Sequence, residues 1–483
     1  MEHTTDRSAE EEDLLSKLPP DVLVSIVERL HLREAIRLAV LSKQWRCLIH
    51  QLPRLDLDAD DFFRRRGSLN RDGVHLVSAG PATYDDRRRT NIFGHGDGGR
   101  TDIFSEANQR MVYAAAALLA SRRPAGTSTT HTTVAMALYP RQNCMLLGRL
   151  LDDAVAGGKA QAAEHAKRAL AGHGHCFRTL VGACPAAFGA LTQLHVEQIG
   201  FVWPRDLHGV LAACPRLEEL SLRDCLPPPL RTPWDVRHAR LARITISNCP
   251  MPHGVDLVWC PRLERFAFKD LRRRFRRTPW LHEKTSPIPL SFGHVPLLTT
   301  VTLCNYYMGS GGDDQRLEHL KLSSILANTD VTDLRLNFRS HNVWVQPEPS
   351  VQLINVFRNL RNLKIRNVHG DSSLAWTMSM FILHAAPHLQ ELYTKLIAHD
   401  CGEEGARKEV PWEADTSFKH YSLTKDTISG CYGTEETIIG FILHLVEVAV
   451  NLKDICMREN ATSVNKVRSH YCRQEFYNTV SKT

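Results

Sequence analysis

The sequence predicts an α/β fold in which a small N-terminal module of three helices is followed by an irregular repeat solenoid, a curved parallel sheet backed by helices. Apolar residues follow a helical period in about the first sixty residues. Farther along, a leucine-containing pattern returns at intervals of 22 to 35 residues, the spacing of stacked supersecondary units. The length of 483 residues, with 43% hydrophobic and 23% charged side chains, allows more than one folded unit.

The N-terminal module begins at the segment LPPD, residues 18–21. Two prolines cost no hydrogen bond in a first helical turn, and Asp21 can cap the exposed amides of that turn, so a helix is expected to start near Asp21. A second short helix is expected over residues 33–40, and Ser42 can cap a third. The apolar positions of the first and third helices are Val22, Leu23, Ile26, Val27, Leu30, Trp45, Leu48 and Ile49.

The order of these residues resembles the F-box over residues 14–55. An opening Leu-Pro, an Asp-Val-Leu and a closing Leu-Ser-Lys-x-Trp-Arg carry the resemblance. It implies a module that inserts apolar side chains between helices of a small F-box-binding adaptor protein, which in turn holds a cullin scaffold. A unit of this size buries little surface alone, which is consistent with a core that a partner completes. The contacts that the resemblance implies are Leu18, Pro19, Val22, Ile26, Leu41 and Trp45.

The repeat follows the template LxxLxLxxC, whose lengths are those of leucine-rich repeats. The central LxL predicts a short strand with both apolar residues facing inward, and stacked coils bury what one coil leaves exposed. In two coils a Cys-Pro pair, at Cys214 and at Cys260, stands just before the repeat leucine, and the proline is expected to end a preceding helix. The middle apolar positions are 194, 220, 244, 266, 301, 334, 363 and 392.

Residues 418–460 predict a strand near residues 420–423, a glycine-containing loop, a helix over residues 435–450 and a last strand at residues 455–457. This order resembles the FBD-like segment that follows leucine-rich repeats in a large family of plant F-box proteins. Its expected role is to cap the open edge of the sheet.

These features divide the chain into six expected regions. They are an acidic tail (1–13), the F-box (14–57), a linker with a helical connection (58–128), the repeat solenoid (129–415), the FBD-like cap (416–460) and a C-terminal tail (461–483). Within the third and fourth regions the sequence predicts a helix over residues 111–121, a strand over residues 132–139 and an alanine-rich helix over residues 144–170.

No motif predicts catalysis: HExxH, GxSxG, a Walker loop and zinc-ligand spacings do not occur. The sequence therefore predicts no enzyme, no catalytic residue, no cofactor and no metal. Gly94, Gly96 and Gly99 satisfy GxGxxG, but no buried strand leads into them, as a dinucleotide site requires. His173 and His175 are interpreted as part of a turn before a strand rather than as a metal-binding tract.

The thirteen cysteines include no CxxC pair, a usage typical of reduced thiols inside the cell. Cys225 and Cys249 occupy the same repeat position on successive coils. They are expected to be buried core residues, because a metal would need four converging ligands.

The segment KDLRRRFRR is strongly basic and lies in a long interval between repeats. A solvated loop, a nuclear-import peptide and a phosphate-binding patch are all compatible with it. The residues assigned to the import or phosphate interpretations are Lys269, Arg272, Arg273, Arg274, Arg276 and Arg277.

The leading functional hypothesis is a substrate-recognition adaptor of a cullin-type (SCF) ubiquitin ligase, with the F-box on the adaptor protein and the repeats on a target protein. Two alternatives are a repeat scaffold without a degradative role and a receptor for a small ligand or nucleic acid. Nucleic acid is not the expected partner, since a net charge of +7 is mild for this size. The N-terminus predicts no export signal, and no apolar run predicts a membrane span, so cytoplasm or nucleus is expected. The target and the oligomeric state are not predicted.

Overall fold

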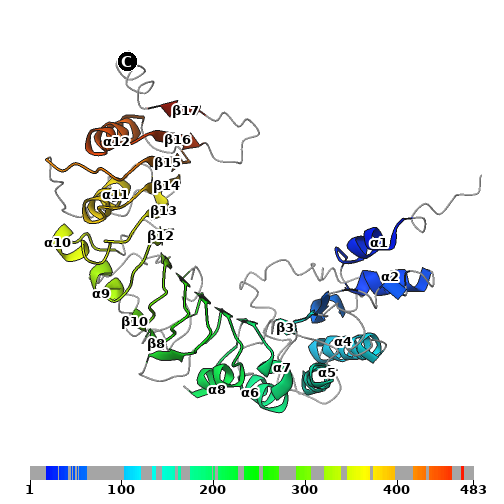
Figure 1. Cartoon of the computed structure of the whole chain (residues 1–483). Coiled ribbons are helices and arrows are strands. Elements are labelled where there is room, and N and C mark those ends of the chain that lie inside the picture. The colour runs from blue at the N-terminus through cyan, green and yellow to red at the C-terminus, as the bar shows by residue number, and fades with distance from the viewer. Residues whose placement is uncertain are drawn as a thin grey trace, which may run out of the picture. The chain divides into compact units, whose positions relative to one another are not determined.

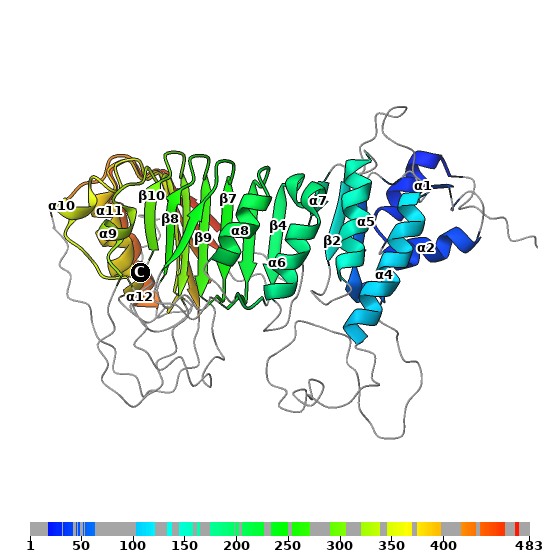
Figure 2. The same ribbon diagram turned by 90° about the horizontal axis from the view of Figure 1, so that it is seen from below.

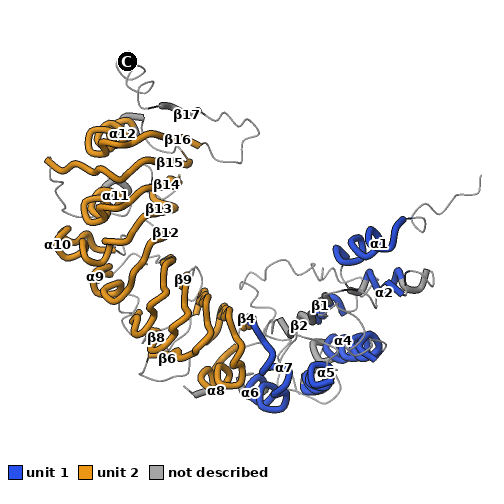
Figure 3. The backbone as a smooth tube through the Cα atoms, viewed as in Figure 1, with its two compact units in different colours: residues 1–193 blue, residues 194–483 orange. Residues whose placement is uncertain are grey.

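The computed structural model divides the chain into two compact units, residues 1–193 and residues 194–483 (Figure 3). The residues that the structure describes are 18–30, 32–41, 45, 47–48, 52, 54–62, 103–120, 133–137, 144–157, 162–164, 174–197, 199–201, 205–226, 233–249, 254–270, 290–305, 320–338, 345–369, 374–397, 417–430, 435–458 and 469–472.

The first unit opens with the expected helices, α1 (Pro20–Val27) and α2 (Leu32–Leu41), and Trp45, Cys47 and Leu48 are also helical. The expectation that Asp21 caps α1 is wrong. Pro19 occupies the N-cap position and no side chain caps the helix, while Asp21 lies inside the first turn. There its negative charge still favours the positive end of the helix dipole.

A three-stranded parallel sheet, β1-β2-β3, follows the helical module. Its strands are in register, with Leu55 opposite Val134 and Leu57 opposite Met136. Leu55 and Leu57 are buried, so β1 carries an LxL pattern that the sequence analysis did not recognise. The helix α4 contacts β1 and α5. The elements after α2 are β1 (Arg54–Asp58), η1 (Ala59–Phe62), α4 (Ile103–Ala120), β2 (Thr133–Ala137), α5 (Cys144–Ala156), β3 (Ala162–Glu164), α6 (Gly174–Ala183) and α7 (Pro185–Gly189).

Two expectations for this unit are wrong. The alanine-rich helix ends at Ala156, because Gly157 begins a turn, and Ala162–Glu164 pairs with β2 as a strand. The His173–His175 segment does not precede a strand directly, because α6 begins at Gly174 and includes His175. The strand over residues 132–139 is confirmed as β2, and the helix over residues 111–121 is part of the longer α4.

The second unit is built on one long sheet whose strands succeed one another along the chain (Figure 1). The described strands of this sheet pair in parallel except the last, β17, which runs antiparallel to β16. In chain order the strands are β4 (Gln193–Glu197), β5 (Glu219–Arg223), β7 (Arg243–Ser247), β9 (Arg265–Asp270), β11 (Thr300–Asn305), β12 (Asp333–Asn337), β13 (Asn362–His369), β14 (Glu391–Ile397), β15 (Lys425–Ser429), β16 (Asp454–Arg458) and β17 (Ser469–Cys472).

The predicted repeat register is confirmed from β5 to β14. The middle apolar residues of successive coils pair directly, for example Val301 with Leu334 and Leu363 with Leu392. Leu334 and Leu363 are both 0% exposed, as a stacked core requires. The solenoid interpretation therefore holds at the level of individual residues.

Helices cover the outer side of this sheet over only part of its length (Figures 1 and 2). They are α8 (Arg205–Ala213), α9 (Leu322–Leu326), α10 (Ser350–Leu353), α11 (Leu374–Ala385) and α12 (Glu435–Val448). Three middle coils instead contribute the parallel strands β6 (Trp234–Arg237), β8 (Val255–Trp259) and β10 (Leu290–His294), which form a second sheet in the order β10-β8-β6.

The expectation of helical backing throughout is therefore wrong for these coils. The coils of β6 and β8 occupy the two shortest repeat intervals, 24 and 22 residues. A strand advances about 3.3 Å per residue and a helix only about 1.5 Å, so these short coils cross the outer side in extended form. β10 lies in a longer interval, of 35 residues, and extends the second sheet by pairing with β8. Pro261 accordingly follows a strand, β8, whereas Pro215 follows the helix α8 as expected.

The two sheets pack closely where β9 and β10 meet. The rings of Phe266 and Phe292 contact edge to face, with centroids 5.4 Å apart. Gly293 is the next residue on β10, and a Cβ atom there would lie 2.6 Å from the backbone oxygen of Val258 on β8. Glycine thus permits the close approach of these strands.

We predict that Gly293→Ala destabilises the second unit by about 1–3 kcal/mol, because the added methyl group forces the backbones of β8 and β10 apart. Gly209→Ala is the matched control, since a Cβ at Gly209 in α8 meets nothing within 4 Å. The control should be neutral or stabilising, because alanine favours helix. Urea unfolding of both variants measures the difference, and equal midpoints would contradict the explanation.

Candidate partner-binding surfaces

The helix α1 has one apolar face inside the chain and one outside it. Leu23 and Val27 are 0% and 1% exposed, whereas Val22 is 40% exposed. Pro19 is exposed as well, and Ile26 is partly exposed. A helix of eight residues with apolar side chains on both faces has one face available to a partner.

The remaining residues of the implied adaptor contact set have different environments. Leu18 is partly exposed. Leu41 is the last residue of α2, and its side chain is outside the described part of the structure. Trp45 is 6% exposed and therefore belongs to the interior of the chain itself. A substitution at Trp45 would confound loss of folding with loss of binding, whereas Val22 can be changed without opening the core.

The second surface is the open face of the long sheet. Along each strand inward apolar residues alternate with residues of the opposite face, as in β12, where Leu334 and Leu336 are buried between the partly exposed Asp333, Arg335 and Asn337. The described helices and the second sheet lie on the other side, so no described helix or strand covers this face of the second unit (Figure 1).

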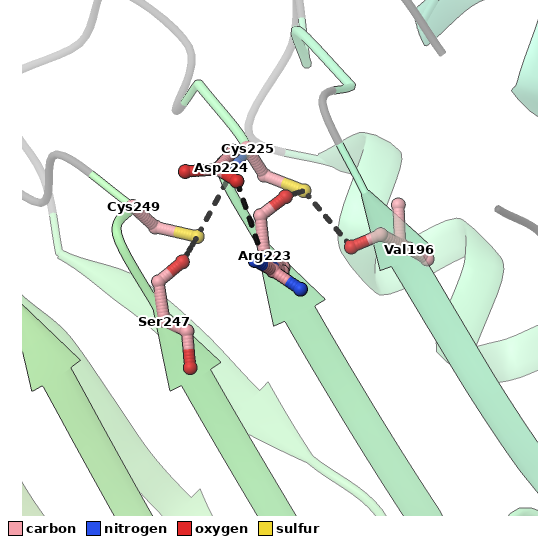
Figure 4. A network of polar contacts seen from close by, with 6 residues as sticks. All are labelled: Val196, Arg223, Asp224, Cys225, Ser247 and Cys249. Carbon is pink, nitrogen blue, oxygen red and sulfur yellow. Dashed lines mark hydrogen bonds and ion pairs between the residues drawn. The ribbon is translucent and has the colours of Figure 1, made fainter. Parts of the chain in front are cut away.

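The cysteines at the ends of β5 and β7 are core residues, as expected. Both are buried; the Cys225 thiol donates to the Val196 carbonyl at 3.4 Å, and the Cys225 N–H donates to Cys249 Sγ at 3.4 Å (Figure 4). Burial raises the pKa of the Cys249 thiol well above its usual range, and Cys225 raises it further. The Cys249 thiol is therefore protonated at neutral pH, and the hydrogen bonds of the two cysteines link neighbouring coils.

Two buried histidines have a structural role that the sequence analysis missed. The corner before most strands is closed by the N–H of the repeat leucine, which donates to a carbonyl three residues earlier, as from Leu217 to Cys214 at 3.0 Å. At the next coil the Leu241 N–H donates instead to Nδ1 of His238, at 3.1 Å. Nε2 of His238 lies 3.0 Å from the carbonyl oxygen of Cys214, so it carries the proton and donates.

His420 repeats this arrangement near the C-terminal end. Its Nδ1 accepts from the Leu423 N–H at 3.0 Å, and its Nε2 lies 2.9 Å from the carbonyl oxygen of Ala386 on the preceding coil. Burial lowers the pKa of both His238 and His420, which keeps the rings neutral. The signal in the sequence is His-x-x-Leu, with histidine three residues before a repeat leucine, where other coils have Cys-Pro-x-Leu.

The coil after His420 also departs from the repeat. The strand expected near residues 420–423 is β15, Lys425–Ser429, and His420 forms only an isolated bridge. Asp426 pairs with Leu392 and Ile455, so a carboxyl group occupies the position of a repeat leucine. This charge at a core position conceals the coil from a search for LxxLxL.

Asp426 is 0% exposed, and neither of its carboxyl oxygens has a hydrogen-bond partner. Burial raises the pKa of this carboxyl group from 3.8 to about 7, and the nearby Thr427 backbone lowers it only in part. A second polar atom, Oγ1 of Thr394 on β14, is also buried without a partner. Burial therefore favours the uncharged form of Asp426, and its ionisation destabilises the final coils.

Several sequence interpretations lie outside the described residues, namely the GxGxxG glycines, His173 and the arginines of the basic segment. Of that segment, Lys269 and Asp270 are seen, at the end of β9. Among the described residues, no three His, Cys, Asp or Glu side chains are placed to hold a metal ion. None of the described helices has the length and hydropathy for a membrane span.

The helical N-terminal module and the in-register leucine-rich-repeat sheet each resemble a known family. Comparison with known families supports both parts. A family model of the F-box domain matches residues 15–57, and one described as "FBD-associated F-box protein At5g56370, LRR repeats" matches residues 159–310.

Similar proteins of Arabidopsis thaliana share short segments with this chain. "Putative F-box protein At3g58860" is 39% identical over 67 residues, 14% of this chain and 15% of the relative. "FBD-associated F-box protein At5g22730" is 41% identical over 51 residues, 11% of each chain. "F-box/LRR-repeat protein 13" is 37% identical over 60 residues, 12% of this chain and 13% of the relative. The matches therefore span only a small part of these relatives.

We predict that Asp426→Asn removes a pH dependence of the C-terminal coils. The pKa of Asp426 is higher in the folded chain than in the unfolded chain, so protonation of this carboxyl group stabilises the fold. This stabilisation is fully present below about pH 4 and is lost as the pH rises through about 7. At pH 8 the variant should exceed the wild type by roughly 2–4 kcal/mol, and at pH 4 the two should be similar. Hydrogen exchange of β15 and β16 measures this, and identical pH profiles would refute it.

Proposed function

We propose that the chain is the substrate-recognition adaptor of a cullin-type ubiquitin ligase. In this proposal the F-box binds the small adaptor protein and the repeat sheet binds a protein target. In this proposal the chain catalyses no reaction itself. It holds the target near the enzyme that carries ubiquitin, and this raises the effective concentration of target lysines at that enzyme. The observation that carries the proposal is the combination, in one chain, of an F-box match with an exposed apolar face on α1.

The proposed adaptor contacts are Leu18, Pro19, Val22, Ile26 and Leu41, with Trp45 supporting them from inside. The exposed Val22 contributes most, because an apolar side chain gains free energy only from surface that it newly buries. Cytoplasm or nucleus is the proposed location, since cullin ligases act there. The domain limits given above remain part of this proposal.

The alternative to be distinguished from the ligase function is a repeat scaffold that binds the adaptor protein but promotes no degradation. Both functions share the F-box contact and differ only in target turnover. A cellular half-life of bound targets that lengthens when the F-box contact is removed favours the ligase, and an unchanged half-life favours the scaffold.

We predict that Val22→Glu lowers co-purification of the F-box-binding adaptor with the full-length chain by about tenfold or more, because a charge is placed in an apolar contact. Ser25→Glu is the matched control, since Ser25 is exposed on the same helix and is not among the proposed contacts. Circular dichroism verifies that both variants fold. A wild-type chain that folds but does not retain the adaptor would refute the proposed function.

A further inference from the structure

The open face of the long sheet separates charge along its strands. From β5 to β16, each strand has two inward positions that alternate with three positions on the open face. One of these three comes before the first inward position, one lies between the two inward positions, and one follows the second. We call these the first, middle and last rows. The first row is Glu219, Arg243, Arg265, Thr300, Asp333, Asn362, Glu391, Lys425 and Asp454.

The other two rows contain no acidic residue. The middle row is Ser221, Thr245, Ala267, Thr302, Arg335, Lys364, Tyr393, Thr427 and Cys456, and the last row is Arg223, Ser247, Lys269, Cys304, Asn337, Arg366, Lys395, Ser429 and Arg458. The first row balances acids against bases, whereas the middle and last rows carry only positive charges. Positive potential is therefore concentrated toward the carboxyl ends of the strands.

The positive charges are densest on β12, β13 and β14. Arg335 lies directly opposite Lys364, and Arg366 lies directly opposite Lys395. We call these four residues the basic cluster. Like charges directly opposite one another destabilise a sheet, and none of the four forms an ion pair with a described residue. An anion bound at this face would relieve the repulsion.

Two further observations concern the side chains of Arg335 and Arg366. Nε of Arg335 is buried and has no hydrogen-bond partner in the described structure. The guanidinium of Arg366 lies over the ring of Tyr393, 5.6 Å from its centroid, which holds one cation in place. Arg335 as a whole is partly exposed, so its guanidinium group can donate charge-assisted hydrogen bonds to an oxygen anion on the open face.

We propose that the basic cluster is the docking surface for an acidic segment of a partner protein, one rich in Asp and Glu. Adjacent strands are about 4.8 Å apart, so the cluster spans about 10 Å across three strands. Carboxylates two residues apart on an extended peptide are separated by about 7 Å and can reach cations on neighbouring strands. This inference rests on the proposed function, for which it names the chemistry of the target.

A protein segment matches this surface better than nucleic acid does. Single-stranded nucleic acid is held by several stacking aromatics along a basic groove, whereas Tyr393 is the one aromatic residue beside the basic cluster in the three rows. Asp333 and Glu391 stand in the first row on two of the same three strands, two residues before Arg335 and Tyr393. They would repel an evenly charged polyanion, whereas a peptide can place a neutral or basic residue against them.

The test measures binding of a fluorescein-labelled peptide of alternating Glu and Ser to the full-length chain by fluorescence polarisation. The variant Lys364→Ser with Arg366→Ser should weaken binding by about tenfold, the combined value of two partly exposed charge pairs. The matched control, Arg243→Ser with Arg265→Ser, removes the same charge from the first row of the same face and should change binding less than about twofold. Lys395→Ser provides an independent third variant.

Three results would overturn the inference. They are no binding by the folded wild type, equal losses in the cluster and control variants, and tighter cluster-dependent binding of an oligo-dT probe, which would make the surface a nucleic-acid site. Co-purification of the F-box-binding adaptor is measured on the same preparations. Loss of adaptor binding with cluster-dependent peptide binding intact would refute the proposed ligase function and leave the docking surface standing.

Discussion

The constraint on which the second unit depends is the in-register stacking of inward side chains from coil to coil. No single coil can bury its own apolar face, so each is stable only between neighbours that present residues at the same level. Phe266, Val301 and Leu334 succeed one another in this ladder, and each is at most 1% exposed. The outer side of a coil can be a helix or a strand because the inward residues of the long sheet keep the same register in every coil.

Departures from the repeat are accommodated by substitutions that keep the backbone hydrogen-bonded. In three middle coils a strand crosses the outer side in place of a helix and pairs with its neighbours as a second sheet. Where a corner lacks its usual carbonyl acceptor, the ring of His238 or His420 accepts the same N–H and donates to the preceding coil. Asp426 is the departure without such compensation, because its carboxyl group is buried without a partner.

The same ladder explains how a repeat protein can bind partners without risking its fold. Inward positions hold the stability, and the alternating positions on the open face can carry any side chain that a strand tolerates. Cations can therefore gather opposite one another on β12, β13 and β14 at a modest cost, which a neighbouring apolar ladder offsets. The F-box module follows a similar division, with Leu23 and Val27 holding α1 in place and Val22 left exposed.

The sequence by itself determined the helical module, the repeat register from Leu220 to Leu392 and the buried state of Cys225 and Cys249, because apolar periodicity reports directly on which residues face a core. Tertiary structure decided what periodicity does not encode. The outer strands β6, β8 and β10 depend on pairing between coils, and Ala162–Glu164 pairs with β2 despite its alanine-rich composition. The strand containing Asp426 was hidden because its neighbours, not its own sequence, enforce the register. The basic cluster likewise exists only in three dimensions, since its four residues come from three strands that the fold aligns.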